Sequence, residues 1–188
     1  MAISYVEDIV SEFYEEQGYF VGRDVQYQVP KEESGKKVSG WKDIDVLAIN
    51  ENDVLIIECK AFTGNMTADK MAKKLSSDYA SAEKSVKEKY KSLIENKQIK
   101  KIFVVDYTPA EELKIELDKK GVKVYLLNEL MKDFLKLLHK KYPNGKTGGS
   151  KRLTRTLIYL LHSEFFKDYQ KREKEREIAV FLGQVLGT

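Results

Sequence analysis

Hydrophobic and polar positions alternate in two different rhythms over the first sixty residues. In residues 3–17 the apolar side chains recur every three or four positions, which predicts an amphipathic helix that ends at Gly18. Residues 19–29 have the pattern of an extended segment. Two apolar runs, 43–49 and 54–60, follow with only a short polar segment between them, and they predict a β-hairpin.

After residue 60 the pattern changes to helices that alternate with strands. A stripe of apolar positions at helical spacing predicts a long helix from about 67 to 96. Buried strands are expected at 101–106 and 122–127, with one helix between them and another after the second strand. Strands separated by helices are typical of parallel crossovers, so we expect an α/β sheet that is covered by helices on both faces.

The segment 143–150, rich in glycine and polar residues, is the best candidate for a linker. It lacks the glycine spacing of a phosphate-binding P-loop. We therefore expect an α/β domain over 1–142 and a helical extension over 151–188. The apolar content of this extension favours packing against the domain or a second subunit, and its basic entrance leaves open a role as a dimerisation element or a DNA-binding arm.

Composition excludes several classes of protein. One cysteine among 188 residues excludes an internal disulfide framework and a cysteine-rich zinc module, and the spacing of His139 and His162 matches no common pair of metal ligands. No stretch approaches the roughly 20 apolar residues that cross a bilayer, and the first residues have no basic segment leading into an apolar one. We therefore expect a cytoplasmic protein without a membrane partner.

The formal net charge of +3 conceals a strong asymmetry along the chain. Residues 1–60 carry 13 acidic and 6 basic side chains, whereas residues 61–188 carry 17 acidic and 27 basic ones. An acidic segment beside a basic remainder is typical of a metal site on a surface that binds a polyanion, although solvation alone produces such asymmetry too.

The predicted hairpin places charged side chains on an otherwise apolar face. If its strands pair across a two- or four-residue connection, Asp45 lies opposite Glu58 and Asp43 lies opposite Lys60, while Ile44 belongs to the reverse face. Adjacent carboxylates in a sheet buried on both sides repel each other and lose hydration. A divalent cation such as Mg²⁺ or Mn²⁺ would stabilise them, which suits the hydrolysis of a phosphodiester.

Less specific interpretations of these residues stay open. Asp45, Glu58 and Lys60 could form an ion-paired strand end near solvent, although three charges on one apolar face favour a functional site. Asp43 fits a partner of Lys60 or a solvent-facing acid better than a metal ligand. Glu7 could be the acid of an N-terminal capping box.

With Glu7 on the first helix, Asp45 and Glu58-Cys-Lys60 on the hairpin, and a long helix after it, the chain resembles the PD-(D/E)xK nuclease superfamily. It is most similar to the archaeal Holliday-junction-resolvase and Mrr-type branches, over residues 3–127. The proline of the motif's name is absent, and no convincing glutamine follows on the next helix. The resemblance implies a restriction-endonuclease-like three-layer α/β/α core with a mixed, roughly five-stranded sheet, followed here by C-terminal helices.

The resemblance also implies roles for individual residues in a Mg²⁺-dependent endonuclease that cuts DNA. Asp45 and Glu58 match the metal ligands, and the backbone carbonyl of Cys59 matches a further one. Lys60 matches the residue that activates the attacking water, and Glu7 matches the first-helix acid that orients water or a second metal. Apart from the resemblance, we expect the Cys59 side chain to belong to the core.

DNA and a second copy of the chain are the expected partners. Lys36, Lys37, Trp41 and Lys42 are candidate DNA contacts, although Trp41 could equally cover the edge of the sheet. A homodimer is expected because nucleases that cut both strands of a symmetric substrate usually act in pairs. The alternatives are a non-catalytic nucleic-acid-binding protein with a nuclease-like fold, and a structural protein that acts through its C-terminal helices.

Overall fold

The fold is described from a computed structural model. It describes residues 5–29, 40–61, 67–109, 111–146, 151–163 and 171. The chain divides into two compact units, residues 1–132 and 133–188, and each is described by itself.

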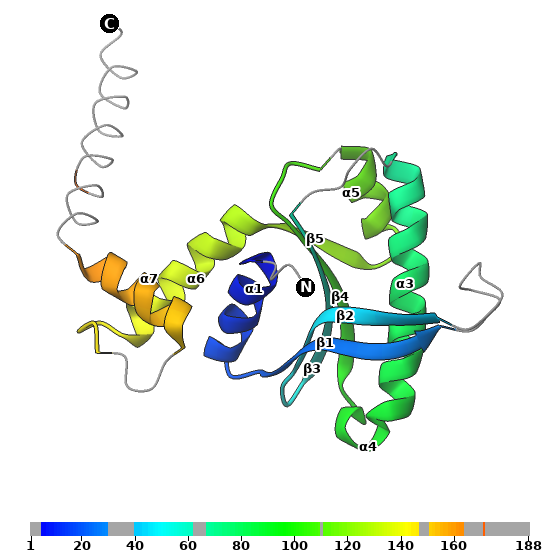
Figure 1. The fold of residues 1–188 in the computed structure, drawn as a ribbon, viewed down its shortest axis with the longest axis horizontal. Helices are drawn as coiled ribbons and strands as arrows, with labels where there is room; N and C mark the ends of the chain where they lie inside the picture. Colours follow the sequence, from blue (N-terminus) through cyan, green and yellow to red (C-terminus); the bar gives the residue numbers. More distant parts are fainter. Residues whose placement is uncertain are drawn as a thin grey trace, which may run out of the picture. The chain divides into compact units, whose positions relative to one another are not determined.

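A five-stranded mixed sheet forms the centre of the first unit and lies in chain order, β1-β2-β3-β4-β5 (Figure 1). Its strands are β1 (Phe20–Val29), β2 (Gly40–Ile49), β3 (Asp53–Lys60), β4 (Gln98–Val105) and β5 (Val122–Leu126). The first three strands pair antiparallel, whereas β3, β4 and β5 pair parallel. The mixed five-stranded sheet expected from the sequence is confirmed.

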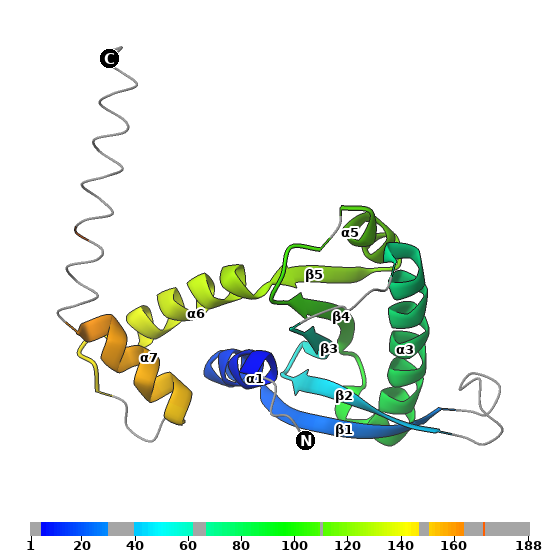
Figure 2. The same cartoon turned by 45° about the horizontal axis from the view of Figure 1, so that its top comes forward.

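Helices cover both faces of this sheet. The described helices are α1 (Tyr5–Glu16), α3 (Ala68–Lys89), α4 (Lys91–Ile94), α5 (Glu111–Asp118), α6 (Leu127–Lys141) and α7 (Arg152–His162). In both views α3 and α5 lie on one face of the sheet and α1 lies on the other (Figures 1 and 2). The predicted three-layer α/β/α arrangement is therefore confirmed.

Two apolar cores hold these layers together, one on each face of the sheet. Because successive side chains of a strand point to opposite faces, Ile56 packs in the core that contains Tyr79 of α3, and Ile57 packs in the core that contains Val10 of α1. All four side chains are at most 1% exposed. Full burial of an aliphatic side chain of this size stabilises the fold by about 1.5–3 kcal/mol, so both helices are anchored firmly to the central strand.

Over its four paired positions the register of the β2–β3 hairpin agrees with the sequence prediction, but the predicted pairs Asp45–Glu58 and Asp43–Lys60 are not formed. Its paired residues run from Ile49 opposite Val54 to Val46 opposite Ile57. Beyond this last pair, β2 continues to pair with β1 on its other side. The charged ends of β2 and β3 therefore lie where the two strands separate.

The predicted face of Ile44 is wrong. Ile44 packs in the core on the α3 side, not on the reverse face. In β1, Val21 packs toward α1 whereas Val25 packs toward α3, so the alternation also changes in that strand. Between them Asp24 has a φ of 49°, in the left-handed region that aspartate tolerates better than most residues. The strand pair thus changes faces beside Asp45.

The long helix predicted over 67–96 is interrupted. Thr67 precedes α3 in an extended conformation, and Asp69 in the first turn complements the positive end of the helix dipole. Tyr90 departs from helical geometry, with a φ of −116°, and only the single turn α4 follows it. The helix that packs over the sheet therefore ends at Lys89.

The second unit contains the end of α6 and all of α7. The division between units falls at residue 132 inside α6, and the predicted linker at 143–150 stays a prediction, with 147–150 outside the described residues. The rings of His139 and His162 stack with their centroids 6.2 Å apart, and His162 Nε2 lies 3.0 Å from the carbonyl oxygen of Tyr142. None of the helices in the described part of the chain has the length and apolarity of a membrane span.

Candidate active site

A cavity of about 440 Å³ opens between β1, β2 and β3 and the helix α3. Its charged lining consists of four acids, Asp43, Asp45, Glu58 and Asp78, and three lysines, Lys42, Lys60 and Lys74. Tyr27, Met71 and Leu75 complete the lining. We call this cavity the carboxylate pocket.

Three of the residues predicted from the sequence come together in the carboxylate pocket. The ammonium nitrogen of Lys60 lies 3.6 Å from Asp45 Oδ2 and 3.7 Å from Glu58 Oε2. At these distances the groups form ion pairs, but they are too far apart for strong direct hydrogen bonds. One ammonium group therefore stands between two carboxylates without binding tightly to either.

The backbone holds the carboxylate of Asp45 in place. The amide N–H of Cys59 donates a hydrogen bond to Asp45 Oδ2 over 2.7 Å. This bond forms just beyond the last paired residues of β2 and β3, so the side chain of Asp45 takes the position of a strand partner for Cys59. The Cys59 side chain itself is 3% exposed and belongs to the core on the α1 side, as predicted.

Glu58 is a buried carboxyl group, and the positive charge around it does not compensate for its loss of hydration. Burial raises its pKa to about 8, and the negative charge of Asp45 acts in the same direction. Lys60 opposes this shift without cancelling it. The pocket therefore stabilises the ionised form of Glu58 poorly, and an additional cation would remove much of this penalty.

Lys60 is a charged group at the end of β3. Burial lowers its pKa, but the carboxylates of Asp45 and Glu58 raise it, and the net shift is upward. Its backbone carbonyl accepts a hydrogen bond of 3.1 Å from the amide of Asp106, which follows β4. The strand end that carries Lys60 is thus held by the neighbouring parallel strand.

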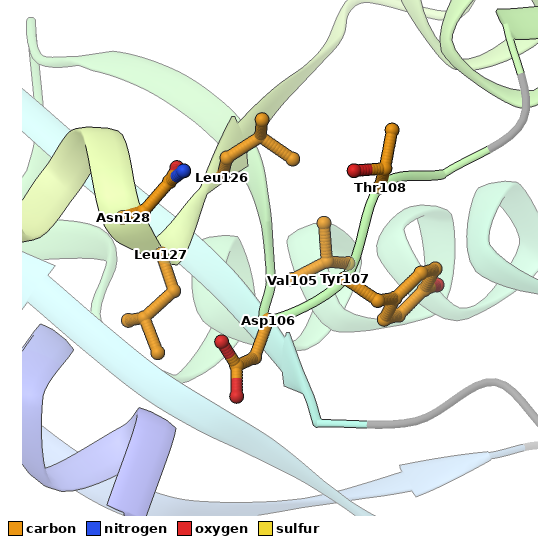
Figure 3. Close-up of a pocket in the computed structure, with 7 residues that line it drawn as sticks. All are labelled: Val105, Asp106, Tyr107, Thr108, Leu126, Leu127 and Asn128. Carbon is orange, nitrogen blue, oxygen red and sulfur yellow. The ribbon is translucent and has the colours of Figure 1, made fainter.

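A second, smaller hollow of about 150 Å³ lies at the carboxyl ends of β4 and β5. Figure 3 shows Asp106 at the end of β4, with Asn128 at the start of α6 on one side and Thr108 on the other. The carboxylate of Asp106 accepts a hydrogen bond from the hydroxyl of Tyr5 on α1. This volume is below the roughly 300–1,000 Å³ of most small-molecule sites, and the link of this hollow to the carboxylate pocket is the backbone bond between Asp106 and Lys60.

Glu7 does not line the carboxylate pocket. It lies on α1, where its Oε2 is 3.5 Å from Nη2 of Arg23 on β1, and Asp8 pairs with the same arginine. Burial and the charge of Asp45 are the two largest causes that raise the pKa of the Cys59 thiol, and the charge of Glu7 is the next. Glu7 therefore lies near the end of β3, on the side of α1. The capping alternative involves residue 4, which lies outside the described residues.

The predicted DNA contacts fall into three groups. Lys36 and Lys37 lie outside the described residues. Lys42 lines the carboxylate pocket and pairs with Asp78. Trp41 does not line the pocket and is 68% exposed, so it covers little of the sheet edge.

Sequence reasoning missed Asp78. This residue lies on α3, seven positions after Met71 and three after Leu75, so all three side chains share one helical face. An acid on a stripe that is otherwise apolar was the available signal. The hydroxyl of Tyr27 on β1 donates a hydrogen bond of 3.3 Å to the backbone carbonyl of Asp78.

The oxygen donors of the carboxylate pocket suit a hard divalent cation. Among the described residues, no three acidic, histidine or cysteine side chains are grouped closely enough to form a metal site by themselves. Mg²⁺, however, is commonly bound by one or two carboxylates while it keeps several waters. Asp45 and the buried Glu58 supply two such groups, in a pocket whose acids outnumber its lysines, so the residues present fit this ion.

Comparisons with known proteins identify the family of the chain. No curated protein matches it in sequence. The crystal structure of AF1548, a protein of unknown function, shares 16% identity with it at a TM-score of 0.43, covering 84% of this chain and 98% of that one. The sequence model of the nuclease-related domain matches residues 4–116, more than half of the chain, and this range includes Asp45, Glu58 and Lys60. The chain therefore belongs to the nuclease-related domain family.

Proposed function

We propose that this protein is a metal-dependent endonuclease that hydrolyses DNA phosphodiester bonds with a PD-(D/E)xK-type site related to those of junction resolvases and Mrr-type enzymes. The observation that carries the proposal is the buried Glu58 beside Asp45, with the ammonium of Lys60 within 3.7 Å of both carboxylates. Membership of the nuclease-related domain family supports the same conclusion.

The metal would be held at the end of β3. Asp45 and Glu58 would supply carboxylate oxygens, and the backbone carbonyl of Cys59 would supply a further one, to Mg²⁺ or Mn²⁺. When bound, such an ion polarises a phosphate oxygen and lowers the pKa of a coordinated water.

The remaining chemistry belongs to the side chains of the pocket. The ammonium of Lys60 can orient the attacking water by hydrogen bonding and can stabilise the negative charge that develops on the phosphate. The Cys59 N–H keeps Asp45 turned toward the pocket. Glu7 acts as a positioning residue from α1, through its ion pair with Arg23 and its proximity to the end of β3.

The same proposal includes the partners of the enzyme. DNA is its substrate, Lys36, Lys37, Trp41 and Lys42 contribute contacts, and two copies of the chain form a homodimer that cuts both strands. A cytoplasmic location fits this substrate.

A cleavage panel tests the proposal. The protein is incubated with Mg²⁺ or Mn²⁺ and labelled single-stranded, duplex, flap and four-way-junction DNA. We expect cleavage of at least one substrate, lost in EDTA and in Glu58→Ala and Lys60→Ala, while circular dichroism shows folded variants. Asp69→Asn is the matched control, because Asp69 pairs with Lys73 on the exposed side of α3. Equal cleavage by Glu58→Ala and the control would contradict the assignment.

One observation favours a second candidate. Lys60 already lies between both carboxylates, an arrangement that a protein without a metal can also use. A non-catalytic nucleic-acid-binding protein with this fold would bind the labelled DNA in a salt-dependent manner but would leave every substrate of the panel intact with both metals.

A further inference from the structure

An ion pair joins β2 to α3 in the lining of the carboxylate pocket. The ammonium group of Lys42 on β2 donates a hydrogen bond to Oδ1 of Asp78 on α3. The two residues are 36 positions apart in sequence, so the fold and not local spacing brings them together. The Asp78 side chain is 12% exposed, whereas that of Lys42 is 37% exposed. The lysine is therefore accessible to a ligand and the acid lies behind it.

The position of Asp78 is determined independently of its partner. Its backbone carbonyl accepts the hydrogen bond from Tyr27, a residue that is only 2% exposed. Tyr79, the next residue, is buried against the sheet and donates from its hydroxyl to the carbonyl of Ile102. This turn of α3 is thus attached to β1 and β4. The backbone position from which the Asp78 side chain extends is therefore fixed.

Two other acid–lysine pairs of α3 differ from this one. Glu83 pairs with Lys101 of β4, but neither residue lines the carboxylate pocket. Asp69 and Lys73 are 2.8 Å apart on successive turns of the helix, and both side chains are more than 60% exposed. Such a pair stays on one element and contributes little to a fold. The Lys42–Asp78 pair instead joins the helix to the strand that carries Asp45, within one cavity. This placement points to a role in the pocket.

We propose that Lys42 binds a phosphate group of the nucleic acid beside the reacting one, and that Asp78 is the positioning residue that holds its ammonium in the lining of the carboxylate pocket. The substrate assumed here rests on the proposed function. An ammonium group has three N–H donors, so a lysine bound to Asp78 still has donors for a phosphate oxygen. The carboxylate also restrains a long side chain that otherwise has many conformers.

Removal of the Asp78 charge would release Lys42. The other acids that line the cavity are Asp43, Asp45 and Glu58. A released ammonium group is then attracted inward by these carboxylates instead of projecting toward the substrate. Asp78→Asn should therefore reduce the affinity for DNA although it removes a negative charge, which is the opposite of what simple charge repulsion predicts.

Binding of labelled duplex and single-stranded oligonucleotides, measured by fluorescence anisotropy in EDTA at several KCl concentrations, tests this proposal without any chemical step. We expect Lys42→Gln to weaken binding by about three- to tenfold and to reduce the slope of log K against log[salt] by about one. Asp78→Asn should weaken binding similarly, Asp78→Glu should restore it, and the double variant should bind no worse than Lys42→Gln alone.

Cleavage assays give a second measurement, since loss of a phosphate contact formed equally in the ground and transition states raises KM with little change in kcat. Asp69→Asn is the matched control. Binding by Asp78→Asn that equals or exceeds that of the control would overturn the proposal, as would fully additive effects in the double variant. Lys42→Gln leaves α3 untouched, so unchanged binding by this variant also overturns it if Asp78→Asn does not fold.

The two proposals fail separately. If the wild-type protein cleaves no DNA but these variants weaken binding as expected, the inference about Lys42 and Asp78 stands and the endonuclease assignment falls. If the wild-type protein cleaves DNA and both variants behave as Asp69→Asn does, the assignment stands and this inference falls.

Discussion

Two clusters in the first unit each place two acids around one basic side chain, yet they differ in chemistry. The arginine cluster consists of Glu7, Asp8 and Arg23, and the lysine cluster consists of Asp45, Glu58 and Lys60. In the arginine cluster the guanidinium offers a separate nitrogen to each acid, and the Asp8 side chain is 38% exposed. In the lysine cluster a single ammonium lies more than 3.5 Å from both acids.

The difference shows how two acids around one basic side chain can support the structure in one place and the chemistry in another, depending on whether the base is arginine or lysine. A planar guanidinium satisfies two carboxylates at once, and solvent helps to screen the remaining charge. A point-like ammonium cannot satisfy both acids at these distances, and Glu58 is too buried for water to compensate. Both clusters carry one net negative charge, but in the arginine cluster the fork of donors and the solvent compensate the second acid. The lysine cluster therefore retains the greater affinity for a further cation.

The largest expected difference between the clusters is in catalysis. Glu58→Gln should reduce DNA cleavage by about 10²–10³-fold, because this carboxylate would hold the ion that supplies several kcal/mol of transition-state charge stabilisation. Glu7→Gln should reduce it by only about tenfold, because Glu7 acts through its neighbours. Single-turnover cleavage rates measure both effects. Equal losses in the two variants would place Glu7 in the reaction itself and remove the distinction between the clusters.

Stability in EDTA should depend on pH through Glu58. Its folded-state pKa of about 8 lies above its ordinary value of 4.5, so folding favours the protonated form. The protonated Glu58 carboxyl therefore contributes to the free energy of unfolding. This contribution is fully present below about pH 4.5 and is lost as the pH rises through 8. At about 1.4 kcal/mol per pKa unit, the loss amounts to a few kcal/mol.

Urea unfolding of wild type and Glu58→Gln at pH 5 and pH 8 measures this difference. The variant lacks the ionisable group, so its stability should fall less between the two values than that of the wild type. Parallel profiles for the two proteins would show that the Glu58 carboxyl is not destabilised by its surroundings.

Loss of the arginine should have a smaller effect. Arg23→Ala leaves Glu7 and Asp8 without their shared partner, but about a third of the Arg23 side chain is exposed, so solvent screens much of the interaction. We expect the free energy of unfolding to fall by about 1 kcal/mol, with Arg23→Lys intermediate because a lysine lacks the fork of donors. Calorimetry gives the values, and a loss as great in Arg23→Lys as in Arg23→Ala would show that the fork itself is required.

The smallest expected effect concerns the support beneath Lys60. Tyr5→Phe removes the hydroxyl that donates to Asp106 and should cost about 0.5–1.5 kcal/mol, the usual net value of one hydrogen bond. Because Tyr5 is about half exposed, we expect the lower end of this range. Denaturant midpoints measure the change, and Tyr159→Phe, in the second unit and 76% exposed, is the control.

The hairpin was predictable because several local signals agree. Two apolar runs of similar length flank a short polar connection, and the side chain of Asn50 accepts hydrogen bonds from the amides of Asn52 and Asp53 at 2.9 and 2.7 Å. A turn with this built-in acceptor restricts the register. Once the register is known, Glu58 and Lys60 necessarily share one strand end.

The face of Ile44 was not predictable in the same way. A strict two-residue alternation assigns it to the side opposite Leu47's, but the alternation changes near Asp24. A left-handed conformation at an aspartate leaves no trace in the pattern of apolar positions, because the residue before and the residue after it are still compatible with a strand. The geometry around Asp45 therefore had to come from the structure.

Asp78 illustrates a different gap. The helical periodicity of its segment is clear, but periodicity alone does not say which strand lies beneath a given turn. The crossover from β3 through α3 to the parallel strand β4 decides that Asp78 lies over the pocket. An acid at the end of a buried strand indicates a functional site already in the sequence, whereas an acid in the middle of an amphipathic helix is normally assigned to its solvent-exposed face.

The single cysteine offers an intrinsic reporter at the centre of the proposed site. Cys59 stands between Glu58 and Lys60, its thiol is buried toward α1, and burial raises its pKa well above the ordinary value. A thiol reagent can reach it only when the layer formed by α1 separates from β3. The rate of alkylation therefore measures how often α1 separates from β3 in the wild-type protein. A divalent ion or DNA that binds on the opposite face of the sheet should slow this rate if it makes β3 more rigid.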